Sequence, residues 1–300
     1  MSKKYNQTRQ RTILINNADN SEKVGSQYRQ ARKYILRGLV NEISKIDRVQ
    51  KCGNTPIGQV QLSVSNQTAY FRGLHTCNSV HVCTVCAPKI LWHRAKDIQK
   101  MIELHSEMNG SLLLLTLTLK HSPEDPLDSL LKAQGEGWDR MVNTKTFANE
   151  KKLYGLTGWV KTSEQLIGEN GFHPHSHTLL FTKTPLSPAE VKKWAQSLTR
   201  RYKRGVESQG FALAEDFIVN LQPITPRDGL ANTLAWYLCK QGFLEERPED
   251  PSGRDAAIQN YGLGNGITPF ELLERISKTG SLDDIRTFNE FELATYGKRQ

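Results

Sequence analysis

One short stretch, residues 171–181, restricts the fold more than any other part of this 300-residue chain. It reads Gly-Phe-His-Pro-His-Ser-His-Thr-Leu-Leu-Phe, and after Pro174 it alternates as a β-strand does. Because a strand puts every second side chain on one face, His175 and His177 point the same way. Proline fits only at the start or edge of a strand, so we expect the pair to lie where solvent and a substrate can reach it.

Two imidazoles at adjacent positions on one strand face can bind one divalent metal ion. The alternative is a polar strand face whose histidines are hydrogen-bonded within the fold. Here His173, His175 and His177 occur within five residues and lead into an apolar strand end. This density favours a metal site.

Two further stretches bear on the purpose of such a metal. Residues 112–119 read Leu-Leu-Leu-Leu-Thr-Leu-Thr-Leu and predict a buried strand with both threonines on one face. Residues 230–240 predict a helix with an apolar stripe of leucines. Tyr237 and Lys240 are neighbours at the edge of that stripe, three positions apart. A core tyrosine beside a surface lysine is the alternative interpretation of this pair.

In this order, the three stretches resemble the plasmid rolling-circle replication initiators, which are HUH endonucleases. Residues 116–119 are similar to the first motif of that family, residues 173–177 to its HUH motif, and residues 237–240 to its Tyr-x-x-Lys motif. The resemblance extends from about Cys52 to the C-terminus. It implies a ferredoxin-like palm, in which an antiparallel sheet is backed by helices.

Four of the five cysteines lie in the first third of the chain, and we expect them to hold a structural Zn²⁺. They are Cys52, Cys77, Cys83 and Cys86. The Cys-x-x-Cys pair lets two thiolates approach one Zn²⁺ from a tight turn, and the other two cysteines can complete a tetrahedron. His75 and His81 are competing ligands, and redox-active or metal-free cysteines are the alternative. The block also resembles the cysteine block of the initiators.

Residues 158–166 predict the strand before the histidine strand, and Glu164 shares a face of it with apolar neighbours. Carboxylates are almost never buried without a partner, so this side chain requires a metal or a cation nearby. A salt bridge is the alternative. In the resembling family a carboxylate on this strand is a natural third metal ligand, and Glu164 is the matching position.

The formal net charge of +9 favours an anionic partner such as nucleic acid, although a merely basic protein would look the same. A predicted helix over residues 88–108 can contact DNA phosphates through its basic side chains, or can present a solvated face. These are Lys89, His93, Arg94, Lys96 and Lys100. No apolar run approaches the ~20 residues of a membrane span. Residues 1–30 lack the apolar segment of a secretory signal, so we expect a cytoplasmic protein without membrane contact.

The predicted fold class is α+β, with an antiparallel sheet backed by helices on one face, an N-terminal zinc-bound segment and a helical C-terminal tail. Four parts are expected along the chain. They are a flexible basic arm at 1–32, a helix plus zinc-binding segment at 33–108, the HUH endonuclease domain at 109–244, and a linker with a helical C-terminal region at 245–300.

The resemblance implies a metal-dependent endonuclease. Mg²⁺ or Mn²⁺ held by His175, His177 and Glu164 would polarise the scissile phosphate. Tyr237 would attack phosphorus once its proton is withdrawn, and Lys240 would lower the pKa of that tyrosine and offset transition-state charge. The products would be a 5′-phosphotyrosine and a free 3′-OH primer, with the reverse reaction rejoining the ends. The implied partners are plasmid origin DNA, single-stranded or extruded as a hairpin, and host helicase and replication machinery, with a homodimer as an open alternative.

Two positions qualify this expectation. Some members of the resembling family carry a glutamate four residues before the tyrosine, where this chain has Thr233, so hydrolytic termination by that route is not predicted. His121, just after the 112–119 strand, is expected to have a supporting role. The alternative functions are another HUH enzyme, a transposase or relaxase, and a non-catalytic zinc-containing DNA-binding regulator.

Overall fold

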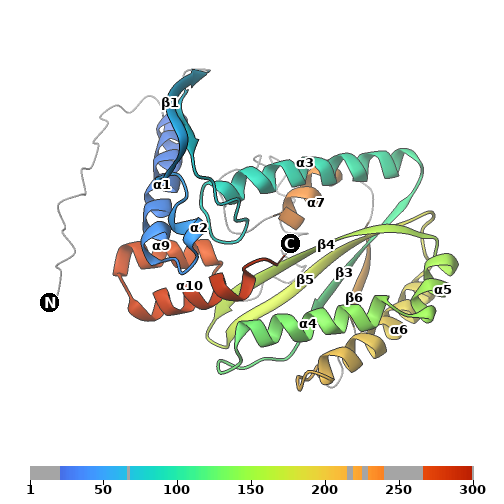
Figure 1. Ribbon diagram of the computed structural model, residues 1–300. Coiled ribbons are helices and arrows are strands. Elements are labelled where there is room, and N and C mark those ends of the chain that lie inside the picture. Colours follow the sequence, from blue (N-terminus) through green and yellow to red (C-terminus); the bar gives the residue numbers. More distant parts are fainter. Residues whose placement is uncertain (1–20, 66–67, 215–218, 225–228, 240–265, 299–300) are drawn as a thin grey trace.

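The structure, a computed structural model, describes residues 21–65, 68–214, 219–224, 229–239 and 266–298 (Figure 1). The strands are β1 Pro56–Ser65, β2 Thr68–Leu74, β3 Ser111–Thr118, β4 Leu156–Gly168, β5 Gly171–Thr182 and β6 Asn220–Ile224. The helices are α1 Ser21–Ile43, α2 Asp47–Gln50, α3 Cys86–Glu107, α4 Leu127–Val142, α5 Lys145–Leu153, α6 Pro188–Glu207, α7 Leu230–Cys239, α9 Pro269–Thr279 and α10 Leu282–Thr295. The predicted α+β class, with antiparallel sheets backed by helices and a helical C-terminal tail, is confirmed. None of the helices in these ranges is both long and apolar enough to cross a bilayer.

The main sheet is antiparallel and has the strand order β4-β5-β3-β6, so the histidine strand β5 is an inner strand. Its register sets Thr116 of β3 opposite His177, and it sets both Thr118 of β3 and Glu164 of β4 opposite His175. Directly opposed residues of an antiparallel pair lie on the same face. The sheet thus gathers these polar side chains on one surface.

A tight turn between β4 and β5 fixes this register. Gly171 begins β5 with a φ of 76°, in the left-handed region that favours glycine. A Cβ atom at this position would lie only 2.9 Å from the Cα atom of Pro123. Glycine is therefore required here for both conformation and space. The sequence Gly168-Glu169-Asn170-Gly171 predicts a hairpin turn, and the structure confirms it.

Helices α4, α5 and α6 cover one face of the sheet (Figure 1). Helices α4 and α6 approach closely at two glycines, because a Cβ atom added to Gly205 would lie 2.5 Å from the Cα atom of Gly137. The sequence Ser187-Pro188-Ala189-Glu190 predicts a helix N-cap, and α6 begins there, with a capping box between the Ser187 side chain and Glu190. Its buried face includes Trp194 and Tyr202.

From the sequence we expected the histidine-bearing face to be open to solvent. In the structure it is instead partly covered by α3 and α7 (Figure 1). His105 of α3 packs edge-on against Phe181, with ring centroids 5.1 Å apart. At this end of the strands the face is apolar, with Leu114 and Leu179 paired across β3 and β5, so burial under a helix removes it from water.

Several predicted boundaries differ from the structure. Helix α1 begins at Ser21, inside the predicted flexible arm of residues 1–32. Polar residues can favour a helix without forming an apolar stripe, so the absence of such a stripe did not reveal this part of the helix. The sequence of residues 127–149 predicts one helix interrupted at Gly135 and Gly137, whereas these residues fall in α4 and α5. The β1–β2 hairpin was not predicted. Residues 1–20 of the predicted arm and residues 245–265 of the predicted C-terminal region lie outside the described residues.

The C-terminal helices return to the N-terminal part of the chain, where α9 and α10 lie beside α1 and α2 (Figure 1). The buried carboxylate of Glu292 in α10 accepts hydrogen bonds from the Ser44 hydroxyl and from the Lys45 backbone N–H. An isolated bridge between Ile167 and Ile267 ties the same tail to β4. The tail therefore stabilises the junction between the sheet and the N-terminal helices.

Candidate metal and tyrosine site

The three predicted ligands of the catalytic metal lie together on β4 and β5. The Oε2 atom of Glu164 lies 2.8 Å from Nε2 of His175 and 3.7 Å from Nε2 of His177. Both histidines are buried, and Glu164 is half-buried. One ligand atom from each residue falls within 4.8 Å of the other two. The group can hold one ion.

The donor set fits a divalent ion. An octahedral ion with bonds of about 2.1 Å holds adjacent ligand atoms about 3 Å apart, close to the spacings between Glu164 and the two imidazoles. Nδ1 of His177 lies 3.1 Å from the Thr116 hydroxyl. An N–H at Nδ1 that donates to this hydroxyl leaves the lone pair at Nε2 directed toward Glu164. Two imidazoles and one carboxylate suit Mn²⁺ or a similar transition metal better than they suit Mg²⁺.

Tyr237 reaches this group from helix α7. Its hydroxyl lies 3.3 Å from Nε2 and 3.5 Å from Nδ1 of His177, and the two ring centroids are 5.1 Å apart. Thr233 lies one turn earlier in α7, where its hydroxyl donates to the Gly229 carbonyl at 3.1 Å. The predicted partner Lys240 lies outside the described residues. Of the two predicted residues of the Tyr-x-x-Lys motif, the structure describes Tyr237, and it places this residue beside the histidines.

A second histidine pair, which the sequence only hinted at, flanks the group. Nδ1 of His121 lies 2.9 Å from the Asn170 carbonyl, and Nε2 of His121 lies 2.7 Å from Nδ1 of His173. A carbonyl only accepts, so in neutral His121 Nδ1 donates and Nε2 accepts from His173. Burial first, and then the charges of His175 and His121, lower the pKa of His173 to about 4. His173 is therefore neutral and keeps its Nε2 lone pair.

The four cysteines of the predicted zinc site lie together and are buried. The Sγ atom of Cys52 lies 3.7 Å from Sγ of Cys83 and 3.7 Å from Sγ of Cys86. These distances are far longer than a disulfide bond of about 2.05 Å. They match the edge of a tetrahedron with Zn–S bonds of about 2.3 Å, which is about 3.8 Å. The group therefore fits a tetrahedral ion.

Backbone N–H groups surround these sulfur atoms. The N–H of Ser79 donates to Sγ of Cys77, and the N–H of Cys86 donates to Sγ of Cys83, each at 3.4 Å. Hydrogen bonds from Cys77, Cys83 and Cys86 hold the pKa of the Cys52 thiol far below its usual range, against the opposing effect of burial. The same group of contacts and burial raise the pKa of the Cys83 thiol, so the thiolate that this arrangement favours is that of Cys52.

The competing ligands His75 and His81 lie outside this cysteine group. Nε2 of His81 instead lies 3.3 Å from the Lys298 carbonyl. Among the described residues, the cysteine group and the Glu164 group are the two that gather three or more potential ligands.

Comparison with known proteins shows which class of protein this chain resembles. Residues 70–197 match the family of replication proteins. This segment contains Glu164, the three histidines of β5 and three of the four clustered cysteines, whereas Cys52 and Tyr237 lie outside it. The predicted resemblance to replication proteins is confirmed.

The individual relatives are distant. A protein of Streptomyces lividans named Protein rep is 24% identical over an alignment of 311 positions. The alignment covers 81% of this chain and 65% of that protein. A Protein rep of Streptococcus pneumoniae is 26% identical over 158 residues, 50% of this chain and 45% of that protein. A neomycin resistance protein of Streptomyces cyanogenus is 23% identical over 36% of this chain and 30% of its own length. The chain spans less than two thirds of each of these relatives. No solved structure matches it.

Proposed function

We propose that this chain initiates rolling-circle replication by nicking one strand of plasmid origin DNA with Tyr237. The observation that carries the proposal is the 3.3 Å distance from the Tyr237 hydroxyl to Nε2 of His177, a member of the metal-ligand group. A nucleophile at this position can reach a phosphate bound at the metal. If the histidines only formed hydrogen bonds within a polar strand face, that alternative would not require a tyrosine hydroxyl beside His177.

Glu164, His175 and His177 would hold Mg²⁺ or Mn²⁺. When bound, that ion supplies positive charge against the non-bridging oxygens of the phosphate, which neutral imidazoles cannot supply. The Thr116 hydroxyl lies at Nδ1 of His177 and so fixes the orientation of that ring.

The tyrosine carries out the covalent step. The Tyr237 oxygen, once its proton is withdrawn, forms a bond to phosphorus, and the bond from phosphorus to the 3′ oxygen breaks. The departing 3′ oxygen takes up a proton and becomes the free 3′-OH that primes synthesis. The phosphotyrosine keeps the phosphoester, so attack by a 3′-OH rejoins the ends without an external energy source. Lys240 remains the predicted source of positive charge beside the phenol oxygen.

The cysteine group would hold Zn²⁺ with a structural role. Cys52 follows α2, whereas Cys83 and Cys86 lie at the start of α3. An ion bound by all four thiolates would fasten these segments to each other at the base of the β1–β2 hairpin. The predicted partition into arm, zinc segment, endonuclease domain and C-terminal region belongs to the same proposal, as do origin DNA, a host helicase and a homodimer as partners.

The test is a covalent-adduct assay. Purified protein is incubated with Mn²⁺ and a labelled single-stranded oligonucleotide carrying the cognate origin, and the products are separated on a denaturing gel. We expect an adduct that requires metal and that is absent in Tyr237→Phe. Cleavage that persists in Tyr237→Phe would identify a different nucleophile. Origin binding without cleavage in either protein would favour the DNA-binding regulator.

A further inference from the structure

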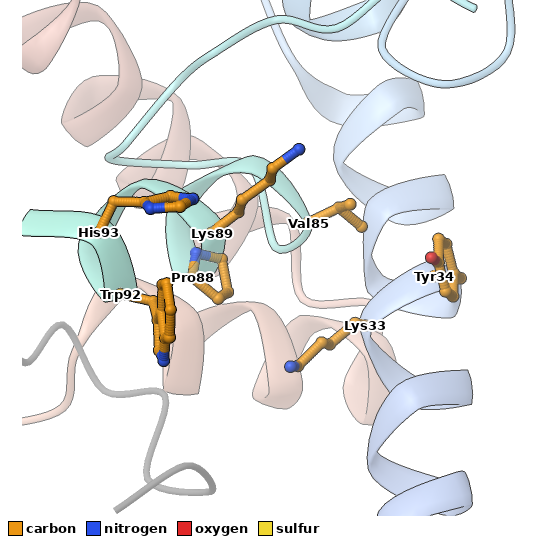
Figure 2. A pocket seen from close by; sticks show the side chains of 7 residues that line it. All are labelled: Lys33, Tyr34, Val85, Pro88, Lys89, Trp92 and His93. Carbon is orange, nitrogen blue, oxygen red and sulfur yellow. The ribbon is translucent and has the colours of Figure 1, made fainter. Parts of the chain in front are cut away.

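A basic and aromatic pocket lies between α1 and the first turns of α3, outside the tyrosine site (Figure 2). Its volume is about 320 Å³. Seven side chains line it, and none of them is acidic. They are Lys33, Tyr34, Val85, Pro88, Lys89, Trp92 and His93. Figure 2 shows Lys33 extending from α1 toward Trp92, and Lys89 extending from α3.

The walls of this pocket are joined by buried contacts. The hydroxyl of Thr84, which is fully buried, donates to the Lys33 carbonyl at 2.7 Å and so links α1 to the segment that leads into α3. On the α1 side, the guanidinium of Arg37 lies 5.0 Å from the ring centroid of Tyr34. The pocket is therefore preformed by the packing of α1 on the cysteine segment.

Trp92 is the unusual member of the lining. It is 43% exposed, although tryptophan is buried in most proteins on average. Its ring meets His93 edge-on, with centroids 4.9 Å apart and an interplanar angle of 85°. Lys89 lies one turn earlier in α3 and therefore on the same side of the helix. An exposed indole beside ammonium groups has the chemistry that single-stranded nucleic acid requires, because bases stack on aromatic rings and phosphates pair with cations.

The pocket is connected to the tyrosine site through α3. Helix α7, which carries Tyr237, packs along α3. Burial raises the pKa of Cys239 to about 11, and the positive charge of Arg94 opposes this rise, so Arg94 acts on the end of α7 two residues after the tyrosine. Arg94 itself follows Trp92 by two residues. A strand bound at Tyr237 can thus continue along the basic helix to the pocket.

We propose that this pocket binds one unstacked nucleotide of single-stranded DNA, with the base against Trp92 and its phosphate beside Lys89. This contact is separate from the phosphate that Tyr237 attacks, and it would anchor the strand that flanks the nick. The choice of DNA as the ligand rests on the proposed function. Duplex DNA is excluded from the stacking contact because its bases are already stacked on each other.

The test measures affinity by fluorescence anisotropy, with a labelled oligothymidine and the Tyr237→Phe protein as the background so that no covalent product forms. Trp92→Ala is expected to weaken binding about tenfold, as the loss of one base–aromatic stack does. Trp92→Phe is expected to restore most of the affinity. The matched control is Met101→Ala, which removes a side chain of similar exposure from the same helix and should leave affinity unchanged.

The phosphate contact has its own readout. Lys89→Ala is expected to reduce the slope of log affinity against log salt by about 0.7, the value for one phosphate contact with a single strand. The control is Lys152→Ala, an exposed lysine of α5 on the other side of the sheet, which should keep the wild-type slope.

Three results would overturn the proposal that the pocket binds a nucleotide. The first is equal affinity of Trp92→Ala and Met101→Ala for oligothymidine, and the second is an unchanged salt slope in Lys89→Ala. The third is a loss of affinity for duplex DNA in Trp92→Ala as large as its loss of affinity for oligothymidine. Competition by polyglutamate as effective as that by oligothymidine would point to an acidic protein partner instead. The adduct assay separates this inference from the nicking proposal. Binding that depends on Trp92 without any adduct refutes nicking alone, whereas an adduct with binding independent of Trp92 refutes the pocket alone.

Discussion

The hydroxyl of Tyr237 lies 3.3 Å from Nε2 of His177, although 60 positions separate the two residues in the chain. The histidine belongs to an inner strand, and the tyrosine belongs to a helix laid across the same face of the sheet. The proposed nucleophile and the proposed metal ligands therefore come from different elements. Substitutions can alter metal binding and the covalent step separately.

Removing the charge of Glu164 should weaken metal binding while the fold is kept. Glu164→Gln preserves the size of the side chain and one carbonyl oxygen, but loses the only anionic donor of the group. We expect the affinity for Mn²⁺ to fall at least about tenfold, measured by isothermal titration calorimetry. The control is Glu136→Gln, which removes an exposed carboxylate paired with Arg140. An unchanged affinity in Glu164→Gln would remove this residue from the ligand set.

The cysteine group should bind one zinc ion per chain. Elemental analysis of purified protein is expected to show this stoichiometry, and Cys83→Ser should lose the metal and lower the unfolding temperature, because zinc bound by the folded state contributes its binding energy to stability. Cys239→Ser is the matched control, since Cys239 is also buried but lies outside the group. Zinc retained in Cys83→Ser would contradict the assignment.

A buried ion pair between α5 and α6 should be a main determinant of stability. Oε2 of Glu150 lies 2.5 Å from a terminal guanidinium nitrogen of Arg201, and the same carboxylate accepts from the Trp194 indole and the Ser197 hydroxyl. Glu150→Ala leaves Arg201 buried without its anion, so we expect a loss of about 3–5 kcal/mol in urea unfolding. Glu136→Ala, which breaks an exposed pair, should change the unfolding free energy by less than about 1 kcal/mol.

One glycine of α6 and one of α4 should respond to alanine in opposite directions. Gly205→Ala in α6 would place a Cβ atom 2.5 Å from the Cα atom of Gly137 and force α4 and α6 apart. We expect destabilisation of about 1–3 kcal/mol. Gly135→Ala meets no atom within 4 Å and lies inside α4, so it should stabilise the protein by about 0.5–1 kcal/mol. Thermal unfolding of both variants checks the prediction, and destabilisation by Gly135→Ala would contradict it.

Glu292 should make stability depend on pH. Burial raises the pKa of this carboxyl above its ordinary value, against hydrogen bonds from Ser44 and the Lys45 backbone. A carboxyl whose pKa is higher in the folded state favours folding below its unfolded pKa of about 4.3, and this contribution is lost as the pH rises through the folded value. Glu292→Gln mimics the neutral form. In urea unfolding, we expect the variant to lose less stability than wild type between acidic and neutral pH, and parallel pH profiles would contradict this.

Local patterns in the sequence were enough for several elements of the fold and the site. The alternation after Pro174 predicted β5, the Ser187–Glu190 capping box predicted the start of α6, and cysteine spacing predicted which thiols gather. Each of these signals is carried by residues close together in the chain. Backbone periodicity, caps and tight turns depend on such neighbours alone.

Other features were not predicted from the sequence, because they depend on contacts between residues far apart in the chain or on how elements pack. The β1–β2 hairpin lies between Cys52 and Cys77, and most of its apolar side chains are exposed, so it has no buried face for a pattern to indicate. The His121–His173 hydrogen bond and the Glu150–Arg201 ion pair join residues about 50 positions apart. No periodic pattern reports such a contact, because it depends on how elements pack.

The sequence by itself determined the kinds of chemistry present, namely paired imidazoles on one strand face, clustered thiols, a helical tyrosine and an excess of positive charge. Only the tertiary structure decided that the tyrosine meets the histidines, that α3 covers part of their face, and that Trp92 and the lysines share a pocket. The physical reason is that side-chain type and local periodicity are fixed residue by residue. The distance between two elements is instead set by strand order and by the burial of apolar surface over the whole chain.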